Sequence, residues 1–301
     1  MSTTPYFSVV IPTYNRASFI PATLDSVLAQ QFADFEVLIV DDGSTDDTAA
    51  VVKRYTDPRL LYLPKANGER GAARNYGFAK ARGEYVLFLD SDDRFLPQHL
   101  ATLHQKIQET GKPNFIACKY NFDRNGVLAD SDVSGLAEGN YGLDFFIQGN
   151  SLACNICVRR ANTALKLFEE ERRFAGVEDW MFLLENTQHD NVYIVDAVTL
   201  TMNDHDARSM HDDSRLLINR WMQLPAWFDK HLRLNASQRS HLLGHIRYLC
   251  AIHAYADGRR SESLRFAFQA ASGLSKTKAA ILLLRCLVGP GVIGQVKKLV
   301  R

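Results

Sequence analysis

The chain has 301 residues, which is enough for one large α/β domain with an appendage or for two modest domains. Hydrophobic residues make up 46% and charged residues 23%, as in ordinary soluble globular proteins. The charges balance, with 35 Lys and Arg against 34 Asp and Glu, so the overall charge indicates no partner and we predict no binding of nucleic acid.

The charge is unevenly distributed along the chain. Residues 212–301 hold 15 Lys or Arg and 5 Asp or Glu, whereas residues 1–211 hold 20 Lys or Arg and 29 Asp or Glu. This asymmetry fits a patch that binds nucleic acid or a membrane surface, but the solvated faces of helices also produce it and are the commoner explanation.

The cysteine usage argues against a secreted disulfide scaffold, because the five cysteines form no regular framework. Cys154 and Cys157 form a C-x-x-C in an apolar setting, and we favour buried thiols over zinc or redox chemistry. The N-terminal residues show no readable secretory signal, and no segment reaches the roughly 18 apolar residues of a membrane span. We therefore expect the protein in the cytoplasm.

The first half of the chain alternates short apolar runs with polar corners and helix-like stretches, which is the pattern of β-α-β units. Runs such as 37–40 and 85–89 lack polar alternation, as expected for strands that are buried on both faces. The predicted strands are 7–11, 35–40, 60–63, 85–89 and 115–118. The predicted helices are 17–30, 45–55, 71–81 and 97–109.

The second half begins with a segment rich in Gly, Asp and Asn, residues 121–150, which we interpret as loops or a small hairpin layer over the sheet. The elements predicted after it are a strand at 156–159, a helix at 177–187, a closing pair of strands at 192–195 and 198–202, and helices near 214–231, 236–256, 259–272 and 276–299. We therefore predict an α/β domain over residues 1–211 and a helical region over residues 212–301.

Two clusters of carboxylates come directly after predicted buried strands. Asp41 and Asp42 follow one strand, and Asp90-Ser-Asp92-Asp93 follows another. In an open parallel sheet such strand ends line one edge, where ligands bind. Crowded carboxylates repel one another unless a cation or hydrogen-bond donors are present, so a hard divalent metal suits this edge. For Asp41 and Asp42, turn or helix-cap chemistry is an equally good explanation.

Five motifs, in order, resemble those of the family-2 glycosyltransferases. They are P-T-Y-N at 12–15, V-D-D-G-S-T-D at 40–46, A-R-N-x-G at 73–77, F-L-D-S-D-D at 88–93 and V-E-D-W at 177–180. The resemblance covers roughly residues 7–210 and implies a GT-A fold, a Rossmann-like and mostly parallel α/β sheet flanked by helices, here with a C-terminal helical appendage. It also implies a nucleotide-sugar donor and inversion at the anomeric carbon.

The resemblance implies roles for individual residues. Tyr14 would pack on the base, Asp42 would accept a hydrogen bond from it, and Arg74 would face the nucleotide. Asp90 is similar to the ribose-contacting member of the D-x-D motif, and Asp92 to the member that binds metal. The donor-binding residues expected are Pro12, Thr13, Tyr14, Asp42, Arg74, Asp90, Ser91 and Arg208.

The chemistry of sugar transfer supports these roles. Asp179, in the Glu178-Asp179 pair, matches the family's general base, and a positioned carboxylate contributes about 10²–10⁴-fold in rate. A divalent metal, manganese or magnesium, held by Asp92 would stabilise the leaving diphosphate. One base suffices for direct inversion, and no dedicated nucleophilic carboxylate for a retaining mechanism is recognisable. His205 is a candidate second metal ligand, and the alternative is a loop histidine without a ligand role.

Other features of the sequence give weaker signals. His241 and His245 have the spacing of a zinc helix but lack the glutamate of H-E-x-x-H, so a surface or packing role is favoured. The segment 276–301 combines apolar clusters with six Lys and Arg residues. It suits helices at an anionic membrane surface as well as helices that cover the catalytic domain. In the first case the enzyme would be peripheral on the inner membrane face, where lipid-linked acceptors reside.

The predicted function is metal-dependent, inverting transfer of a sugar from a nucleotide-diphosphate donor, a UDP-sugar, to a hydroxyl of a glycan or lipid-linked acceptor in cell-surface polysaccharide synthesis. The alternative is a catalytically inactive sugar-nucleotide-binding or scaffold protein of the same fold. The presence of both the D-x-D motif and Glu178-Asp179 argues against it, since a binder needs no base. A nucleotidyltransferase is a third possibility, although the segment 12–16 is not a glycine-rich phosphate loop.

Overall fold

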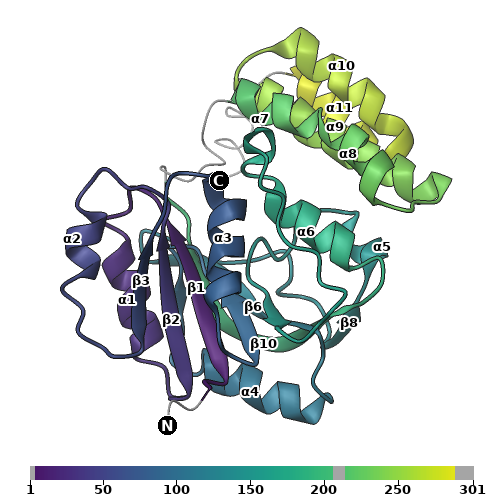
Figure 1. Ribbon diagram of the computed structural model, residues 1–301. Coiled ribbons are helices and arrows are strands. Elements are labelled where there is room, and N and C mark those ends of the chain that lie inside the picture. Colours follow the sequence, from purple (N-terminus) through teal and green to yellow (C-terminus); the bar gives the residue numbers. More distant parts are fainter. Residues whose placement is uncertain (1–3, 206–213, 289–301) are drawn as a thin grey trace. The chain divides into compact units, whose positions relative to one another are not determined.

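The computed structural model describes residues 4–205 and 214–288 of the chain. Two compact units can be distinguished (Figure 1). The N-terminal unit comprises the residues up to 143 together with 150–206, and the C-terminal unit comprises 144–149 and the residues from 207 onward. The predicted domain boundary between residues 211 and 212 lies outside the described residues and stays a prediction.

A mixed sheet forms the centre of the N-terminal unit, with the strand order β3-β2-β1-β4-β9-β6-β10-β5. Two further strands extend it, β7 beside β6 and β8 beside β10. The strands are β1 (Phe7–Thr13), β2 (Phe35–Asp41), β3 (Leu60–Pro64), β4 (Tyr85–Phe88), β5 (Arg94–Phe95), β6 (Phe115–Arg124), β7 (Val127–Asp130), β8 (Gly139–Tyr141), β9 (Cys157–Arg159) and β10 (Val192–Asn203).

The first four long strands run parallel and place their carboxyl ends at one edge. Strand β1 pairs in parallel with both β2 and β4, and β2 pairs in parallel with β3. All residues of β1, β2 and β4 are buried, which explains why their sequences lack polar alternation. The predicted α/β fold with helices flanking a sheet is confirmed, with β9 as an antiparallel strand between β4 and β6.

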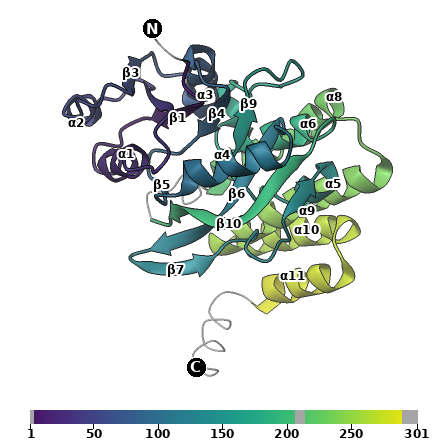
Figure 2. The same ribbon diagram turned by 90° about the horizontal axis from the view of Figure 1, so that it is seen from below.

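Helices cover both faces of this sheet, with α1 and α3 on opposite faces (Figure 1). Helix α3 packs on β1 and β2, while α4 packs on β6 and β10, as the view from below shows (Figure 2). The helices of the N-terminal unit are α1 (Ile20–Leu28), α2 (Thr48–Val52), α3 (Glu69–Lys80), α4 (His99–Glu109) and α6 (Glu178–Asn186). Helix α5 (Leu143–Phe146) belongs to the C-terminal unit from residue 144 onward.

The hairpin predicted within residues 121–150 forms, but its strand β7 pairs with β6 and extends the central sheet, so the prediction of a layer over the sheet is wrong. Strand β6 continues past its predicted end to Arg124 and turns through Asn125 and Gly126 into β7. Both turn residues have positive φ angles, 55° and 84°, as a two-residue hairpin turn with the right-handed strand twist requires. The extension of β6 is therefore a consequence of its partner strand.

The closing pair of strands predicted over 192–202 is a single strand, so that prediction is wrong. Strand β10 runs from Val192 to Asn203 and pairs in parallel with β6 throughout. Its register shifts twice between Val195 and Leu200, so the chain bulges without leaving the sheet. The polar Asp196 interrupts the apolar pattern at the bulge, so the sequence shows a break where the strand continues.

The C-terminal unit is helical, as predicted. Its helices are α7 (Ser214–Trp221), α8 (Leu224–His231), α9 (Ala236–Ala256), α10 (Arg260–Ala270) and α11 (Lys276–Val288), with a 3₁₀ turn at Ala271–Gly273. The helix expected over 214–231 is divided in two, because Pro225 lies in the first turn of α8 and has no N–H to continue α7. Helix α9 begins with a capping box between Asn235 and Gln238.

Within the described residues, no helix has both the length and the apolar character that crossing a bilayer demands.

The glycine of the A-R-N-x-G motif has a packing role that can be tested. A Cβ added to Gly77 would lie 2.3 Å from Cγ1 of Val10 and 3.0 Å from Cγ2 of Val40, so α3 approaches β1 and β2 closely there. We expect Gly77→Ala to lower the free energy of unfolding by roughly 1–3 kcal/mol, as overpacking does. Urea unfolding followed by circular dichroism measures this change.

The matched control is Gly135→Ala, since a Cβ at Gly135 has no neighbouring atom within 4 Å. An unfolding curve for Gly77→Ala that coincides with that of Gly135→Ala would contradict the packing role.

Candidate active site

The loops after β1 and β2 are joined by hydrogen bonds at the carboxyl edge of the sheet. Asn15, which has a positive φ of 50°, accepts a hydrogen bond from Thr45 N through its Oδ1 at 2.8 Å. The backbone N–H of Arg16 donates to Thr48 Oγ1 at 3.0 Å. These contacts fix the P-T-Y-N segment against the V-D-D-G-S-T-D segment, so the first two motifs lie side by side.

The residues predicted to bind the donor base lie on these two loops. Tyr14 exposes 47% of its surface, so its ring is available to a ligand. Pro12 and Thr13 are buried at the end of β1, and Thr13 Oγ1 has no hydrogen-bond partner among the described residues. Asp42 N donates to Thr13 O at 2.9 Å, which places Asp42 next to the end of β1.

Asp41 and Asp42 have different surroundings. Asp41 accepts hydrogen bonds from Ser44 N and the Tyr62 hydroxyl, as a residue that stabilises a turn does. The Asp42 carboxylate is buried and accepts from Lys65 Nζ at 2.6 Å and from Gly68 N at 2.9 Å. Neither caps α2, which begins after Asp47, so the helix-cap explanation is wrong for both residues.

Lys65 is a site residue that the sequence reasoning missed. It follows the end of β3 directly, in the same position relative to its strand that Asp42 has relative to β2. The sequence analysis selected polar residues that directly follow predicted strands, and the same criterion applied to β3 selects Lys65. With its Nζ shared between Asp42 and Ala66 O, Lys65 brings a positive charge to the predicted base-binding carboxylate.

Arg74 connects two motifs that lie far apart in the sequence. Its Nη1 donates to Glu178 Oε1 and its Nη2 donates to Asp90 Oδ1, both at 2.7 Å. The guanidinium is fully buried and lies over the Phe168 ring, 5.3 Å from the centroid. Removing one partner of such a buried pair costs about 3–5 kcal/mol because the other charge stays buried. Direct contact of Arg74 with a nucleotide stays a prediction.

Asn75, the next residue of the same motif, fixes the segment that carries Phe168. Its Nδ2 donates to Phe168 O at 2.8 Å, and Phe168 N donates to Asn75 Oδ1 at 3.0 Å. Phe168 also stacks on Phe182 of α6 with the ring centroids 4.2 Å apart. The A-R-N-x-G motif therefore packs on the sheet through Gly77 and positions the start of α6 through Arg74 and Asn75.

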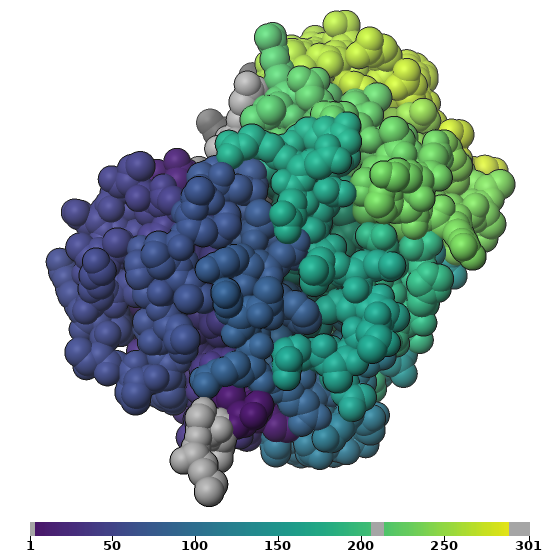
Figure 3. All heavy atoms as spheres, viewed as in Figure 1, coloured from purple at the N-terminus to yellow at the C-terminus, as the bar shows by residue number. Residues whose placement is uncertain are grey.

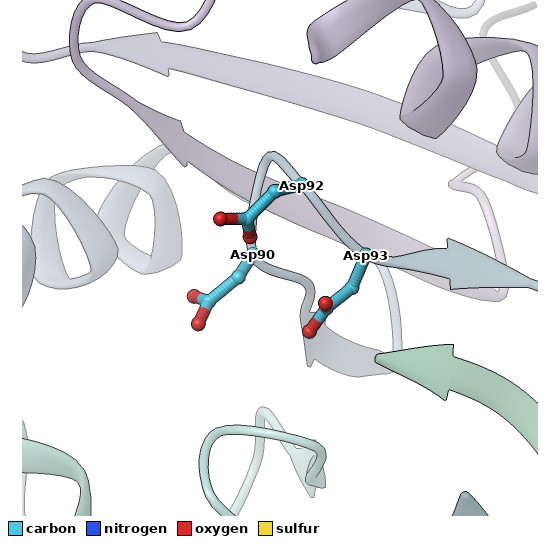
Figure 4. A group of neighbouring side chains, drawn as sticks. All are labelled: Asp90, Asp92 and Asp93. Atoms are coloured by element: carbon cyan, nitrogen blue, oxygen red, sulfur yellow. The ribbon is translucent and has the colours of Figure 1, made fainter. Parts of the chain in front are cut away.

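The three carboxylates after β4 form a compact group. One oxygen from each of Asp90, Asp92 and Asp93 lies within 4.8 Å of the others, and all three project to the same side of the loop (Figure 4). Asp93 is buried and accepts a hydrogen bond from Asn203 N, while Asp90 and Asp92 are partly exposed. An all-oxygen group of this size fits a hard divalent cation.

His205 lies beside this group. Its Nε2 is 3.0 Å from Asp92 Oδ2, and its ring stacks on Phe19 with the centroids 4.3 Å apart. The other ring nitrogen, Nδ1, is buried without a hydrogen-bond partner among the described residues. The contact shows that the chain after β10 reaches the D-x-D motif, so His205 is within reach of a cation held by Asp92.

A cavity of about 280 Å³ opens next to Asp92. Its polar wall includes the ion pair of Arg94 and Asp123, and its apolar wall includes Phe19. The hairpin turn at Gly126 contributes to its rim. The space beside the acidic group is therefore lined by residues from the start of α1, from β5 and from the β6–β7 hairpin.

Asp179 lies in the first turn of α6, next to Glu178. Its Oδ2 accepts a hydrogen bond from Asn150 Nδ2 and its Oδ1 accepts from Trp180 N, both at 2.8 Å. Burial raises the pKa of Asp179 to about 6, and the charge of Glu178 acts in the same direction. Arg74 and the two hydrogen bonds oppose the rise in this pKa but do not cancel it.

The other residues singled out in the sequence have structural roles or lie outside the described residues. The backbone carbonyl of Ser91 accepts a hydrogen bond from Thr23 Oγ1 at 2.9 Å, which holds the D-x-D turn on α1. Arg208 lies outside the described residues. Cys154 and Cys157 are buried free thiols whose pKa is raised by burial, as favoured from the sequence. His245 is partly buried and His241 exposed, on α9, and neither joins an acidic or metal-binding group among the described residues.

Comparison with known proteins identifies the family. Residues 8–162, just over half of the chain, match the model of Glycosyl transferase family 2. The chain belongs to this family. The family suggested by the five motifs is thereby confirmed, and the described geometry belongs to a family-2 chain.

Among curated relatives, an uncharacterized glycosyltransferase of Rickettsia conorii is 38% identical over 167 residues, which is 54% of this chain and 26% of the relative. The GalNAc(5)-diNAcBac-PP-undecaprenol β-1,3-glucosyltransferase of Campylobacter jejuni is 35% identical over 142 residues, which is 43% of this chain and 46% of the relative. The matches thus span about a quarter to a half of these relatives' lengths.

Two solved structures have the same fold as this chain. The crystal structure of S. aureus TarS 1–349 in complex with UDP-GlcNAc gives a TM-score of 0.60 at 21% identity and covers 92% of this chain and 90% of that chain. The structure of the mannosyltransferase PcManGT from Pyrobaculum calidifontis in complex with GDP-Man and Mn²⁺ gives a TM-score of 0.58 at 18% identity. It covers 93% of this chain and 79% of that chain. At these identities the similarity concerns the fold.

The raised pKa of Asp179 predicts a pH-dependent difference in stability. An acid whose pKa is higher in the folded state than in the unfolded state binds its proton more tightly when folded. Its contribution to the free energy of unfolding therefore falls as the pH rises through the pKa of the folded state. We expect Asp179→Asn to be more stable than the wild type at pH 7, by on the order of 1–3 kcal/mol, with the gap closing between pH 6 and pH 4.

Urea unfolding of both proteins across this pH range measures the gap. Asn150 can rotate its amide to pair with the new side chain, since its Oδ1 has no hydrogen-bond partner among the described residues. A stability difference that is the same at pH 4 and pH 7 would show that Asp179 does not titrate as described.

Proposed function

We propose that this chain is an inverting glycosyltransferase that transfers a sugar from a nucleotide-diphosphate donor, a UDP-sugar, to a hydroxyl group of an acceptor. The observation that carries the proposal is the buried Arg74, which ties Asp90 of the D-x-D motif to Glu178, the neighbour of Asp179. A group able to bind a metal and a group able to act as a base are thereby held together on one scaffold. TarS was crystallised with UDP-GlcNAc, which supports a UDP-sugar as donor.

The donor would bind across the carboxyl ends of β1, β2 and β4. In this arrangement the exposed ring of Tyr14 packs on the base and the Asp42 carboxylate accepts a hydrogen bond from it. Lys65 holds the Asp42 carboxylate in place through an ion pair of 2.6 Å. The remaining donor-binding residues proposed are Pro12, Thr13, Arg74, Asp90, Ser91 and Arg208.

Asp92 and His205 would hold a divalent metal, manganese or magnesium. The carboxylate group supplies hard oxygen ligands, and the partly buried His205 ring adds a nitrogen that manganese accepts. When bound, such a metal supplies Lewis-acid stabilisation of the charge on the leaving diphosphate. PcManGT was solved with GDP-Man and Mn²⁺, which supports this choice of metal.

Asp179 would act as the general base. Its carboxylate removes the proton from the acceptor hydroxyl as the acceptor oxygen bonds to the anomeric carbon, and the bond to the diphosphate breaks on the opposite face. The nucleoside diphosphate leaves and the proton remains on Asp179. A carboxylate with a pKa of about 6 is still ionised at neutral pH and is a stronger base than an ordinary one.

The acceptor we propose is a glycan or a lipid-linked sugar of cell-surface polysaccharide synthesis. The Campylobacter jejuni relative is named for an acceptor on undecaprenyl diphosphate, which supports a lipid-linked acceptor. The location we propose is the cytoplasm, with the enzyme peripheral on the inner membrane face. The rival function, a sugar-nucleotide-binding protein without chemistry, does not explain a carboxylate whose pKa is raised beside a buried arginine.

Replacement of the base tests the catalytic role. We expect Asp179→Asn to lower the turnover number by about 10²–10⁴-fold while the dissociation constant of the donor stays nearly unchanged. Release of nucleoside diphosphate from the donor measures turnover, and titration calorimetry measures donor binding. The control is Glu185→Gln on the same helix, which should retain turnover. Unchanged turnover in Asp179→Asn would remove Asp179 from the mechanism.

Replacement of the metal ligand tests the cation site. We expect UDP-GlcNAc to raise the melting temperature of the wild type in the presence of Mn²⁺ but much less in its absence. In Asp92→Asn, addition of Mn²⁺ should no longer increase this shift. The control is Asp132→Asn, which changes an exposed carboxylate of the same unit. A Mn²⁺ effect that persists in Asp92→Asn would show that the cation binds elsewhere.

A further inference from the structure

Helix α11 has two apolar faces, of which its own unit covers one. Ala279, Leu282 and Cys286 are buried and pack the helix on its unit, mainly on α10. Ile281, Leu284 and Leu287 expose 62%, 63% and 56% of their surfaces. Residues three apart on a helix are neighbours, so these three side chains form one exposed stripe. Aligned apolar side chains of this size on a surface indicate an interaction site.

Positive charges lie beside this stripe. Lys276, Lys278 and Arg285 are all exposed, and none of them forms an ion pair within residues 214–288. Lys278 Nζ lies 4.5 Å from the centroid of the Tyr248 ring, and Arg285 Cζ lies 5.3 Å from that of Tyr255. The aromatic rings hold these two cations in place without neutralising them.

Within residues 214–288, the acidic residues do not compensate the charge of α11. Asp229 pairs with Arg239, and Asp257 and Glu262 pair with Arg259. The helix itself has no acidic residue in its sequence from Lys276 to Val288. The face of α11 is therefore both apolar and cationic, a combination that attracts an anionic partner.

A cavity lies at the edge of the same face. It has a volume of about 350 Å³, with Tyr248, Ile252 and Ile281 among its apolar walls. Lys278 and Arg285 also line it, so both cations lie at an apolar hollow. In the space-filling view, α11 (yellow) forms part of the outer surface of its unit (Figure 3).

We propose that the outer face of α11 is a docking surface for the anionic phospholipids of a membrane. The apolar stripe enters the boundary between head groups and acyl chains, the three cations contact lipid phosphates, and the cavity receives part of a lipid molecule. Charge favours this partner over a second copy of the chain, since a symmetric contact would bring the cations of two α11 helices together. This surface and the transferase site are formed by different residues, so each can be tested alone.

Binding to lipid vesicles tests the proposal with the full-length chain. We expect the wild type to float with vesicles of phosphatidylcholine and phosphatidylglycerol but not with vesicles of phosphatidylcholine alone, and high salt should weaken binding. The triple variant Ile281→Ser, Leu284→Ser, Leu287→Ser should bind at least ten-fold more weakly. The charge variant Lys276→Gln, Lys278→Gln, Arg285→Gln should lose the preference for phosphatidylglycerol.

The matched control is Val127→Ser, Leu128→Ser, which removes an equally exposed apolar pair from β7 of the N-terminal unit. It should bind vesicles like the wild type. All variants change exposed side chains, and circular dichroism together with donor-induced stabilisation verifies that each is folded. These controls also separate the two proposals, because loss of vesicle binding with intact donor binding leaves the transferase function untouched.

Three results would overturn the proposal. The first is equal vesicle binding by the wild type and the Ile281, Leu284 and Leu287 variant. The second is vesicle binding that is abolished in a chain ending at Val288 but unaffected in the triple serine variant. This result would assign the contact with the vesicle to residues 289–301. The third is a concentration-dependent dimer, seen by sedimentation equilibrium, that the triple serine variant abolishes, which would make the face an interface between copies.

Discussion

The buried guanidinium of Arg74 is the contact on which the site depends. It joins Asp90, 16 residues away in the chain, to Glu178, 104 residues away. A charge in the interior is tolerated only when it is paired and hydrogen-bonded. The folded state would therefore lose stability if the two carboxylates and the arginine were not brought together. The loop after β4 and the first turn of α6 are therefore held at a fixed distance, and with them Asp92 and Asp179.

The sheet supplies the rest of the geometry. Parallel pairing of β1 with β2 and β4 puts the ends of three strands at one edge, and each end carries a polar side chain. Helix α3 is pressed onto this sheet through Gly77 and carries Arg74 on the same helix. Close packing of α3 on the sheet thus determines how deeply Arg74 is buried. The packing of the core therefore also positions the residues of the site.

The electrostatic balance at α6 explains how two adjacent acids can serve different purposes. Glu178 is buried and neutralised by Arg74, and it also accepts a hydrogen bond from Gly176 N. Asp179 shares the field of Arg74 but is not its direct partner, so burial and the charge of Glu178 together raise its pKa. The resemblance singled out Asp179 of this pair, and the structure adds the difference in surroundings: Glu178 is hydrogen-bonded to Arg74, whereas Asp179 accepts from Asn150 and from the backbone of Trp180.

Much of the fold followed from the sequence because buried strands and amphipathic helices are local patterns. The apolar runs ending at Val40 and Leu89, and the carboxylates after them, identified the edge of the sheet and the D-x-D motif without coordinates. Contacts between distant segments did not follow, because spacing in the chain does not encode which side chains meet. The pairing of Lys65 with Asp42, the burial of Arg74 between two acids, the continuity of β10 through its bulges and the outward stripe of α11 were decided only by the tertiary structure.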